Sequence, residues 1–207
     1  MLSKLFEKHG SDKHRNGYTD LYESLFKNIR DRDLVILEIG VGCKIIMGRE
    51  YSPGASLMAW GDYFPRARIF GTDVAYEVTN LTMMDGRVTT HYCDSTDLKQ
   101  VADFMNEVRK TLDILEDQSV FDLIIDDGSH LQNSQIKTLR HFFPMLRKNG
   151  IWITEDIGGD SRNLGYKSCR KFHPPRKIIK EIIGEDTSCY VVHDWVQHDS
   201  AVLVISV

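Results

Sequence analysis

The sequence predicts an α/β protein with a doubly wound, mostly parallel sheet of seven strands that ends in an antiparallel C-terminal hairpin. Short apolar segments alternate with capped helical segments along the chain, as in sheets covered by helices on both faces. The last two apolar segments are only five residues apart, which suits an antiparallel pair and is too short for a helical crossover. A chain of 207 residues, 42% of them hydrophobic, is long enough for one such domain with a sizeable core.

Seven segments are expected to form strands. The first, LVILEIG at residues 34–40, is a continuous apolar run, which is typical of a strand buried on both faces. The other expected strands cover residues 67–73, 87–94, 121–127, 150–156, 188–195 and 201–207.

Helical segments precede and separate these strands. The segment at residues 95–112 opens with Ser95 or Thr96, either of which can cap a helix. Pro144 is expected to bend or end the helix at residues 133–150, because a proline has no backbone N–H to donate. The other expected helices cover residues 2–9, 19–28, 54–64 and 175–184.

The composition narrows the class of protein. The formal net charge is −4, so no global basic surface points to nucleic acid or to an anionic membrane. The N-terminus lacks a leader pattern, and no run approaches the ~20 apolar residues of a membrane span. The four cysteines show neither a C-x-x-C pair nor zinc-ligand spacing, which indicates reduced thiols; they are Cys43, Cys93, Cys169 and Cys189. We therefore expect a cytoplasmic protein.

Acidic residues stand at the end of every expected parallel strand. Open parallel sheets bind their ligands in the crevice beyond these carboxyl ends, so this edge is where a site is expected. The acids are Glu38, Asp73, Asp94, the pair Asp126 and Asp127, and the pair Glu155 and Asp156.

The first three strand ends point to a nucleoside. Gly40 and Gly42 allow a ligand to approach the backbone closely, but residues 43–53 separate them from Gly54, where the next helix is expected to begin, which argues against a pyrophosphate cradle. A carboxylate at Asp73 can bind both ribose hydroxyls, and Asp94 can accept from an exocyclic amine. The pattern favours S-adenosylmethionine, and the alternative for each acid is a helix cap or a loop position.

The last two strand ends point to a metal. Asp127, Glu155 and Asp156 would repel one another if their strands are neighbours, and a hard divalent cation such as Mg²⁺ or Ca²⁺ would relieve that repulsion. Asp126 points the opposite way along a regular strand. His130 lies beside these acids and can act as a general base. The alternative is a set of solvated acids that cap the following helices.

These stretches resemble a known family. LEIGVG, PGASLMAWGDYFPRARIFGTDV, FDLIIDDGSH, FFPMLRKNGIWITEDI and the N-terminal GSDKHRNGYTDLYESLF are similar to class I S-adenosylmethionine-dependent methyltransferases. More narrowly, they resemble the metal-dependent sugar O-methyltransferases of macrolide biosynthesis, the macrocin and mycinamicin type. The resemblance covers most of residues 7–157, and its IDDGSH and ITED motifs are its most specific part.

The resemblance implies a Rossmann-like methyltransferase fold and a division of roles. It implies that Asp127, Glu155 and Asp156 hold Mg²⁺ and that His130 is the base. Residues 1–30 are expected to pack over the cofactor site, with Lys13 and Tyr18 closing it, and residues 31–207 to form the catalytic domain. Asp126 is assigned to the cofactor or to a capping role. The cofactor set is completed by Glu38, Gly40, Gly42, Asp73, Asp94 and Ser95.

The implied reaction is methylation of a hydroxyl, expected in a vicinal diol of a sugar-containing small molecule. Two alternatives stay open: a non-catalytic S-adenosylmethionine-binding module, and a relative of the cephalosporin-hydroxylase or catechol type. The resembling enzymes carry a long N-terminal region without a counterpart in these 207 residues, and their aromatic-rich stretch differs from residues 158–169. The resemblance therefore predicts the type of reaction better than it predicts the acceptor molecule. A homo-oligomer is the common state of such domains.

Overall fold

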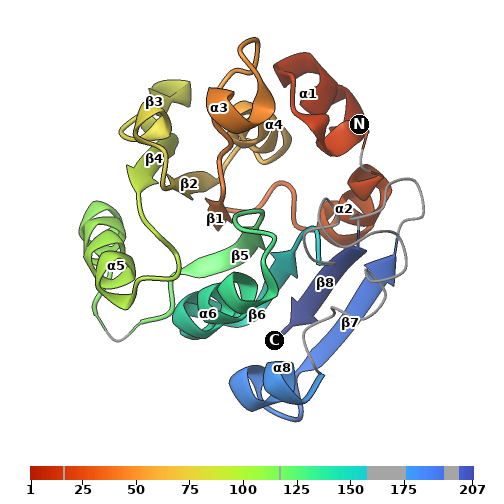
Figure 1. The fold of residues 1–207 in the computed structure, drawn as a ribbon, viewed down its shortest axis with the longest axis vertical. Helices are drawn as coiled ribbons and strands as arrows, with labels where there is room; N and C mark the ends of the chain where they lie inside the picture. The colour runs from red at the N-terminus through yellow and green to blue at the C-terminus, as the bar shows by residue number, and fades with distance from the viewer. Residues whose placement is uncertain (16, 117, 158–175, 194–200) are drawn as a thin grey trace.

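The protein has three layers, with one sheet lying between two layers of helices (Figure 1). The computed structural model describes residues 1–15, 17–116, 118–157, 176–193 and 201–207. The predictions for residue 175, residues 194–195, Cys169 and residues 158–169 lie outside the described residues. Within the described part of the chain, no helix is long and apolar enough to cross a bilayer.

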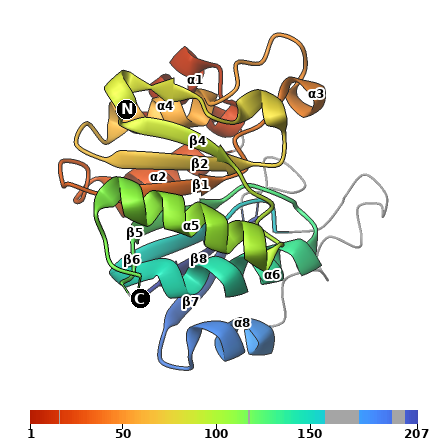
Figure 2. The ribbon, with the colours of Figure 1, turned by 90° about the vertical axis from the view of Figure 1, so that its left-hand side faces the viewer.

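The five expected parallel strands are confirmed. β1 lies at the centre, between β2 and β5, and β4 and β6 extend the sheet on either side. All five run in the same direction, as Figure 2 shows from the side. Their bounds are β1 Val35–Ile39, β2 Arg68–Asp73, β4 Val88–Tyr92, β5 Phe121–Asp126 and β6 Leu146–Thr154.

The C-terminal hairpin is also confirmed. β8, Ala201–Ser206, pairs antiparallel with both β6 and β7, Ser188–His193, so the last strand lies inside the penultimate one. A two-residue strand that the sequence did not predict, β3 at Thr82–Met83, pairs antiparallel with β4. The described sheet therefore has eight strands in the order β3-β4-β2-β1-β5-β6-β8-β7.

Helices cover both faces because the strand residues alternate between two cores. Ile36 packs with the core of α1, α2 and α4, whereas Leu37 packs with that of α5, α6 and α8. The helix bounds are α1 Leu2–His9, α2 Tyr18–Phe26, α4 Ala55–Tyr63, α5 Leu98–Leu112, α6 Gln132–Phe142 and α8 Arg176–Ile183. Short helical turns occur at η1 Asp12–His14, α3 Lys44–Met47, η2 Tyr76–Val78, η3 Met84–Gly86 and η4 Phe143–Met145.

Two helix boundaries differ from the prediction. The cap of α5 is Asp97, whose side chain accepts from two backbone N–H groups, so Ser95 and Thr96 do not cap this helix. The helix expected to run to residue 150 ends at Phe142, and the next strand already begins at Leu146. Pro144 ends the helix as expected, and the residues after it join the sheet.

The N-terminal helices share a core with the sheet domain. The ring of Trp60 on α4 contacts Phe6 of α1, with centroids 4.8 Å apart, and Tyr22 of α2, with centroids 5.3 Å apart. All three side chains are fully buried. This aromatic contact fixes the N-terminal segment against the sheet and determines where the turn between α1 and α2 lies.

The order of the strands reverses between β1 and β5, and one glycine allows the two strand ends to meet. Gly40 has a φ of 89°, and a Cβ there would lie 2.0 Å from the carbonyl oxygen of Asp127. The N–H of Asp127 donates to the carbonyl of Ile39 at 2.8 Å. Only glycine permits both this left-handed conformation and this close approach.

Replacing Gly40 by alanine is expected to destabilise the fold by more than the ~1–2 kcal/mol of a left-handed alanine alone. The added methyl group would overlap a backbone carbonyl that cannot move away, which adds the cost of overpacking. Urea denaturation should show a lower midpoint with a similar slope. Gly10→Ala is the matched control, because its φ is 78° and nothing lies within 4 Å of its Cβ position. Equal losses in both variants would contradict the close-approach account.

Candidate active site

A buried lysine from the N-terminal segment joins three strand ends. Nζ of Lys13 lies 2.5 Å from Oδ2 of Asp127, beyond β5, and 2.7 and 2.8 Å from the two carboxylate oxygens of Glu155, beyond β6. It also lies 3.4 Å from Oε1 of Glu38 on β1. Two of these acids, Asp127 and Glu155, are 114 and 142 positions away from Lys13 in the sequence.

Lys13 stays charged despite its burial. Its side chain is 2% exposed, and loss of hydration alone would lower the pKa of the ammonium group. The nearby carboxylates of Asp127, Glu155 and Glu38 outweigh this effect and hold the pKa of Lys13 well above its ordinary value. The ammonium is therefore the internal counter-ion of the acids at this edge.

Glu155 and Glu38 also accept hydrogen bonds from hydroxyl groups. The hydroxyl of Tyr22 on α2 donates to Oε1 of Glu155, so this carboxylate faces the N-terminal segment. Oε2 of Glu38 accepts from the Ser56 hydroxyl at 2.7 Å. Burial and the charge of Asp127 raise the pKa of Glu155, and Lys13 opposes that shift. One ammonium does not fully balance this group of acids.

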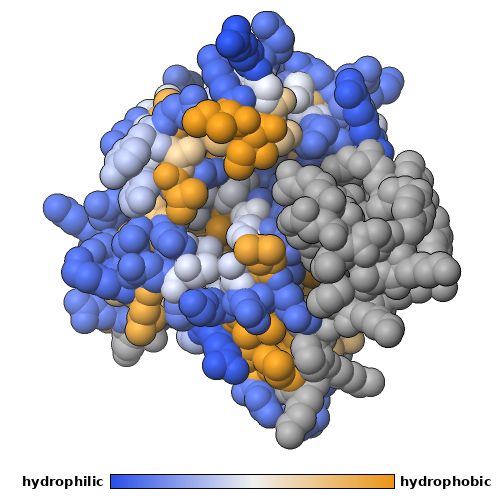
Figure 3. All heavy atoms as spheres, in the orientation of Figure 1, coloured by the Kyte–Doolittle hydropathy of each residue, from blue (hydrophilic) through white to orange (hydrophobic). Residues whose placement is uncertain are grey.

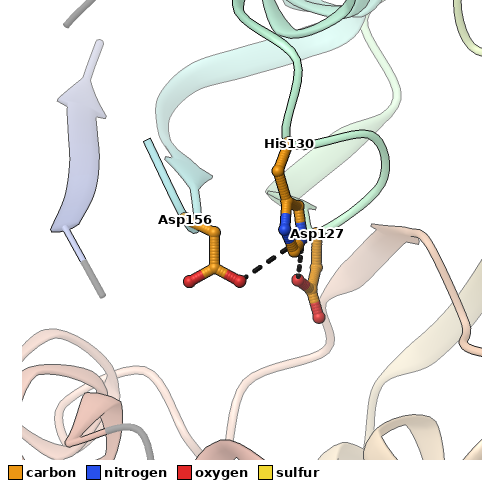
Figure 4. A group of neighbouring side chains, drawn as sticks. All are labelled: Asp127, His130 and Asp156. Carbon is orange, nitrogen blue, oxygen red and sulfur yellow. Dashed lines mark ion pairs between the residues drawn. The ribbon is translucent and has the colours of Figure 1, made fainter. Parts of the chain in front are cut away.

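Three side chains converge next to this ion pair. Oxygens of Asp127 and Asp156 and a ring nitrogen of His130 all lie within 4.8 Å of one another, as three ligands of one metal ion would. Nε2 of His130 lies 3.6 Å from Oδ1 of Asp127 and 3.3 Å from Oδ2 of Asp156 (Figure 4). Among the described residues, Glu155 is outside this group, since its oxygens face Lys13 and Tyr22.

His130 is held protonated by the same two carboxylates. Its partial burial would lower its pKa, but Asp127 and Asp156 raise the pKa of His130 to about 9. The imidazole is therefore a cation at neutral pH unless another positive charge neutralises the acids. A group that must accept a proton here depends on such a charge.

Lys13 and Tyr18, expected beside the cofactor, lie at the acids. The hydroxyl of Tyr18 donates to Oδ1 of Asp156, and Lys13 binds Asp127 and Glu155. The structure thus brings both side chains to the residues predicted to hold a metal. Their expected role in closing the cofactor site stays a prediction.

The glycine loop and Asp73 lie together, as a nucleoside site requires. Oδ2 of Asp73 accepts from the N–H groups of Val41 and Gly42 at 2.9 and 3.2 Å, and Oδ1 accepts from Ala75 at 2.9 Å. A carboxylate has about four acceptor positions, so these three bonds leave room for a ribose hydroxyl. Asp73 also holds the glycine loop in place through these bonds.

Asp94 and Ser95, which were also assigned to the cofactor, have protein partners. Oδ1 of Asp94 accepts from the N–H and the hydroxyl of Thr96, both at 2.8 Å. The Ser95 hydroxyl pairs with that of Thr138 on α6 at 2.7 Å, which ties the end of β4 to this helix. Oδ2 of Asp126 is buried without a hydrogen-bond partner among the described residues, and burial raises the pKa of Asp126 to about 7.

An apolar surface lies over α3, which follows the carboxyl end of β1. Ile45 and Ile46 are 90% and 78% exposed, and Figure 3 shows apolar side chains gathered there. Beside it is an open hollow of about 470 Å³. Its lining comes from two stretches, one from α1 through η1 and one from the end of α3 onward: Glu7, Gly10, Ser11, Asp12, His14, Arg15, Met47, Glu50 and Tyr51.

Sequence reasoning missed Tyr22 and its contact with Glu155. Tyr18 and Tyr22 are four residues apart on α2, so both hydroxyls leave the same face of the helix. This spacing is readable in YTDLY, although the sequence alone does not say which carboxylates the two tyrosines meet. Both contacts depend on how α2 docks against the sheet.

Known proteins resemble this chain in sequence. No family model matches it. The 8-demethyl-8-(2-methoxy-alpha-L-rhamnosyl)-tetracenomycin-C 3'-O-methyltransferase of Streptomyces olivaceus is 30% identical over 158 residues, 75% of this chain and 36% of that protein. The 8-demethyl-8-alpha-L-rhamnosyl tetracenomycin-C 2'-O-methyltransferase of the same organism is 31% identical over 157 residues, 75% of this chain and 37% of that protein. The chain thus spans little more than a third of these relatives.

A solved structure shares the fold. The MycE methyltransferase from the mycinamycin biosynthetic pathway, in complex with Mg, SAH and mycinamycin VI, superposes with a TM-score of 0.71 at 24% identity. The match covers 99% of this chain and 53% of that one. The predicted Rossmann-like methyltransferase fold is confirmed. The predicted resemblance to S-adenosylmethionine-dependent sugar O-methyltransferases is confirmed by the relatives that the chain matches in sequence and by the fold that it shares with this solved structure.

Replacing Lys13 by methionine is expected to destabilise the protein by about 3–5 kcal/mol, because it leaves buried carboxylates without their counter-ion. Chemical denaturation measures the loss. Adding Glu155→Gln should restore part of the stability, since the second change removes one of the stranded charges.

Lys8→Met is the matched control for that prediction. Lys8 also pairs with a carboxylate, Asp62, but its side chain is 60% exposed, so its removal should leave stability unchanged within error. If Lys13→Met were as mild as Lys8→Met, Lys13 would not be the counter-ion of the buried acids.

Proposed function

We propose that the protein is a Mg²⁺-dependent O-methyltransferase that transfers the methyl group of S-adenosylmethionine to a hydroxyl of a sugar-containing small molecule. The observation that carries this proposal is the convergence of Asp127, Asp156 and His130 at the carboxyl ends of β5 and β6. This group lies directly beyond Gly40, at the point where the strand order reverses. A nucleoside site and a cation site would therefore be neighbours.

The cofactor would lie at the glycine loop. Gly40 and Gly42 form the left-handed turn after β1, and Asp73 stands at the end of the adjacent strand with acceptor positions for ribose hydroxyls. Asp94 follows the next strand and would accept from the adenine amine. Glu38, Ser95 and Asp126 support this pocket through their contacts with α4, α6 and the β5 turn.

The side chains at β5 and β6 fit a hard divalent cation. Asp127 and Asp156 offer carboxylate oxygens, which Mg²⁺ prefers. Together with Glu155 and Glu38 they make four acids, whereas Lys13 and His130 supply only two positive charges. Asp127 and Asp156 would hold the ion. Glu155, which the sequence predicted as a third ligand, lies beside them, but its oxygens face Lys13 and Tyr22. A bound Mg²⁺ supplies positive charge that lowers the pKa of an acceptor hydroxyl.

His130 would act as the base. Neutralising Asp127 and Asp156 removes the charges that keep the imidazole protonated, so that Nε2 becomes free to accept a proton. The acceptor oxygen then forms a bond to the methyl carbon while the carbon–sulfur bond breaks and its electron pair remains on sulfur. The hydroxyl proton passes to Nε2 of His130. Because the sulfonium donor is already activated, the protein contributes mainly position and proton removal.

The relatives support a glycoside as the acceptor. Two of them are named for methylation at the 2' and 3' positions of rhamnosyl tetracenomycin derivatives, which are neighbouring hydroxyls of one sugar. Such an acceptor has a polar sugar and an apolar remainder. The hollow beside η1 and the exposed Ile45 and Ile46 of α3 offer both kinds of surface next to the site.

The direct test is methyl transfer with radiolabelled S-adenosylmethionine to a panel of rhamnosylated aromatic polyketides and macrolides, with and without Mg²⁺. The proposal expects labelled product only when Mg²⁺ is present. Binding of S-adenosylmethionine without turnover on any acceptor would favour the non-catalytic module instead. Turnover of catechols but not of glycosides would favour the catechol-type relative.

His130→Gln is expected to reduce kcat by at least ~10²-fold, the usual contribution of a positioned general base. Glutamine keeps the polarity but cannot take the proton. Calorimetry should show S-adenosylmethionine affinity unchanged within about twofold, because His130 is not in the proposed cofactor pocket. His9→Gln is the matched control, because Nε2 of His9 also lies beside a carboxylate, that of Asp62 on α4, at 2.8 Å. An equal loss of cofactor binding and turnover in His130→Gln would remove the base assignment.

A further inference from the structure

We propose that Tyr18 and Lys13 are positioning residues of the cation site, because each holds one oxygen of a ligand carboxylate and leaves the other oxygen facing His130. This inference rests on the proposed function and extends it to the N-terminal segment. It assigns to η1 and α2 a part of the metal site rather than only a cover over the cofactor.

Asp127 uses its two oxygens on opposite sides. Oδ2 lies 2.5 Å from Nζ of Lys13, whereas Oδ1 lies 3.6 Å from Nε2 of His130. Lys13 is itself anchored by both oxygens of Glu155. The ammonium therefore fixes the rotation of the Asp127 carboxylate and directs Oδ1 toward the shared position.

Asp156 shows the same division. Its Oδ1 accepts from the Tyr18 hydroxyl, and its Oδ2 lies 3.3 Å from Nε2 of His130. Figure 4 shows the carboxylate of Asp156 directed toward His130. Two acids from different strand ends are thus oriented toward one point by two side chains of one segment.

The backbone of Asp156 is held as well. Its φ of 50° is in the left-handed region, which is uncommon for a residue other than glycine. Nε2 of the buried Gln135 on α6 donates to the carbonyl of Glu155 at 3.0 Å and to that of Asp156 at 3.5 Å. The ligand carboxylate is therefore clamped between α6 through its backbone and α2 through its side chain.

Tyr18 is suited to hold this position. It is 1% exposed, so the ring cannot swing into solvent. A phenol is protonated at neutral pH and can therefore donate to a carboxylate. Partners that orient a ligand in this way commonly change metal affinity by about 10- to 100-fold when removed.

Tyr18→Phe tests the proposal, because it deletes the hydroxyl and keeps the ring. Calorimetry with Mg²⁺ alone should show a Kd at least about tenfold higher than that of the wild type. Tyr63→Phe is the matched control: its hydroxyl also donates to a carboxylate, that of Glu23 at 3.2 Å, but on the far side of the N-terminal core. Its Mg²⁺ affinity should equal that of the wild type. Thermal melts check that both variants fold.

The outcomes separate this inference from the proposed function. Wild-type affinity for Mg²⁺ in a folded Tyr18→Phe variant would overturn the positioning role while leaving the metal site intact. Equal weakening in Tyr18→Phe and Tyr63→Phe would also overturn it, because the effect would then be general. Absence of Mg²⁺ binding by the wild type would instead overturn the metal-dependent function itself. If Tyr18→Phe fails to fold, Tyr18→Met, which also lacks the hydroxyl donor, replaces it under the same criteria.

Discussion

The crowding of carboxylates at the ends of three neighbouring strands is the constraint on which the rest of the structure depends. Glu38 and Glu155 are buried and Asp127 is partly buried beside them, so their like charges repel strongly and uncompensated charge is costly. Lys13 meets that constraint from a segment remote in sequence. Its ammonium requires the turn between α1 and α2 to lie over the sheet edge, and the aromatic packing on Trp60 holds the turn there.

The same electrostatics connects structure to chemistry. Acids that face one another attract cations, and three cations are relevant at this site: the ammonium of Lys13, the protonated ring of His130 and the proposed Mg²⁺. Because His130 and the metal ion would share the two oxygens that face the imidazole, binding of the metal would favour the deprotonated base. In this account, the metal ion activates the acceptor and also sets the protonation state of the residue that deprotonates it.

Local patterns in the sequence predicted the strands of the sheet. They did not predict how the N-terminal helices dock against it. The apolar runs and the acids after them follow from strand periodicity, so the grouping of Asp127 with Asp156 was predictable. The position of Lys13 was not, because it is set by the packing of α1 and α2 on α4. At α5, Ser95, Thr96 and Asp97 are consecutive candidate caps, and only the path of the β4 loop selects Asp97. A two-residue strand such as β3 is too short to show the alternation of apolar and polar residues from which a strand is predicted.

The protonation of His130 tests this account most directly. NMR titration of the metal-free protein should show His130 titrating near pH 9, well above the ~6.5 of an ordinary histidine, because Asp127 and Asp156 stabilise its charged form. Saturating Mg²⁺ should move that pKa downward, since the ion neutralises the same carboxylates and competes with the proton. A pKa that is ordinary without Mg²⁺, or that does not change when Mg²⁺ binds, would contradict the claim that the metal ion and His130 share these two acids.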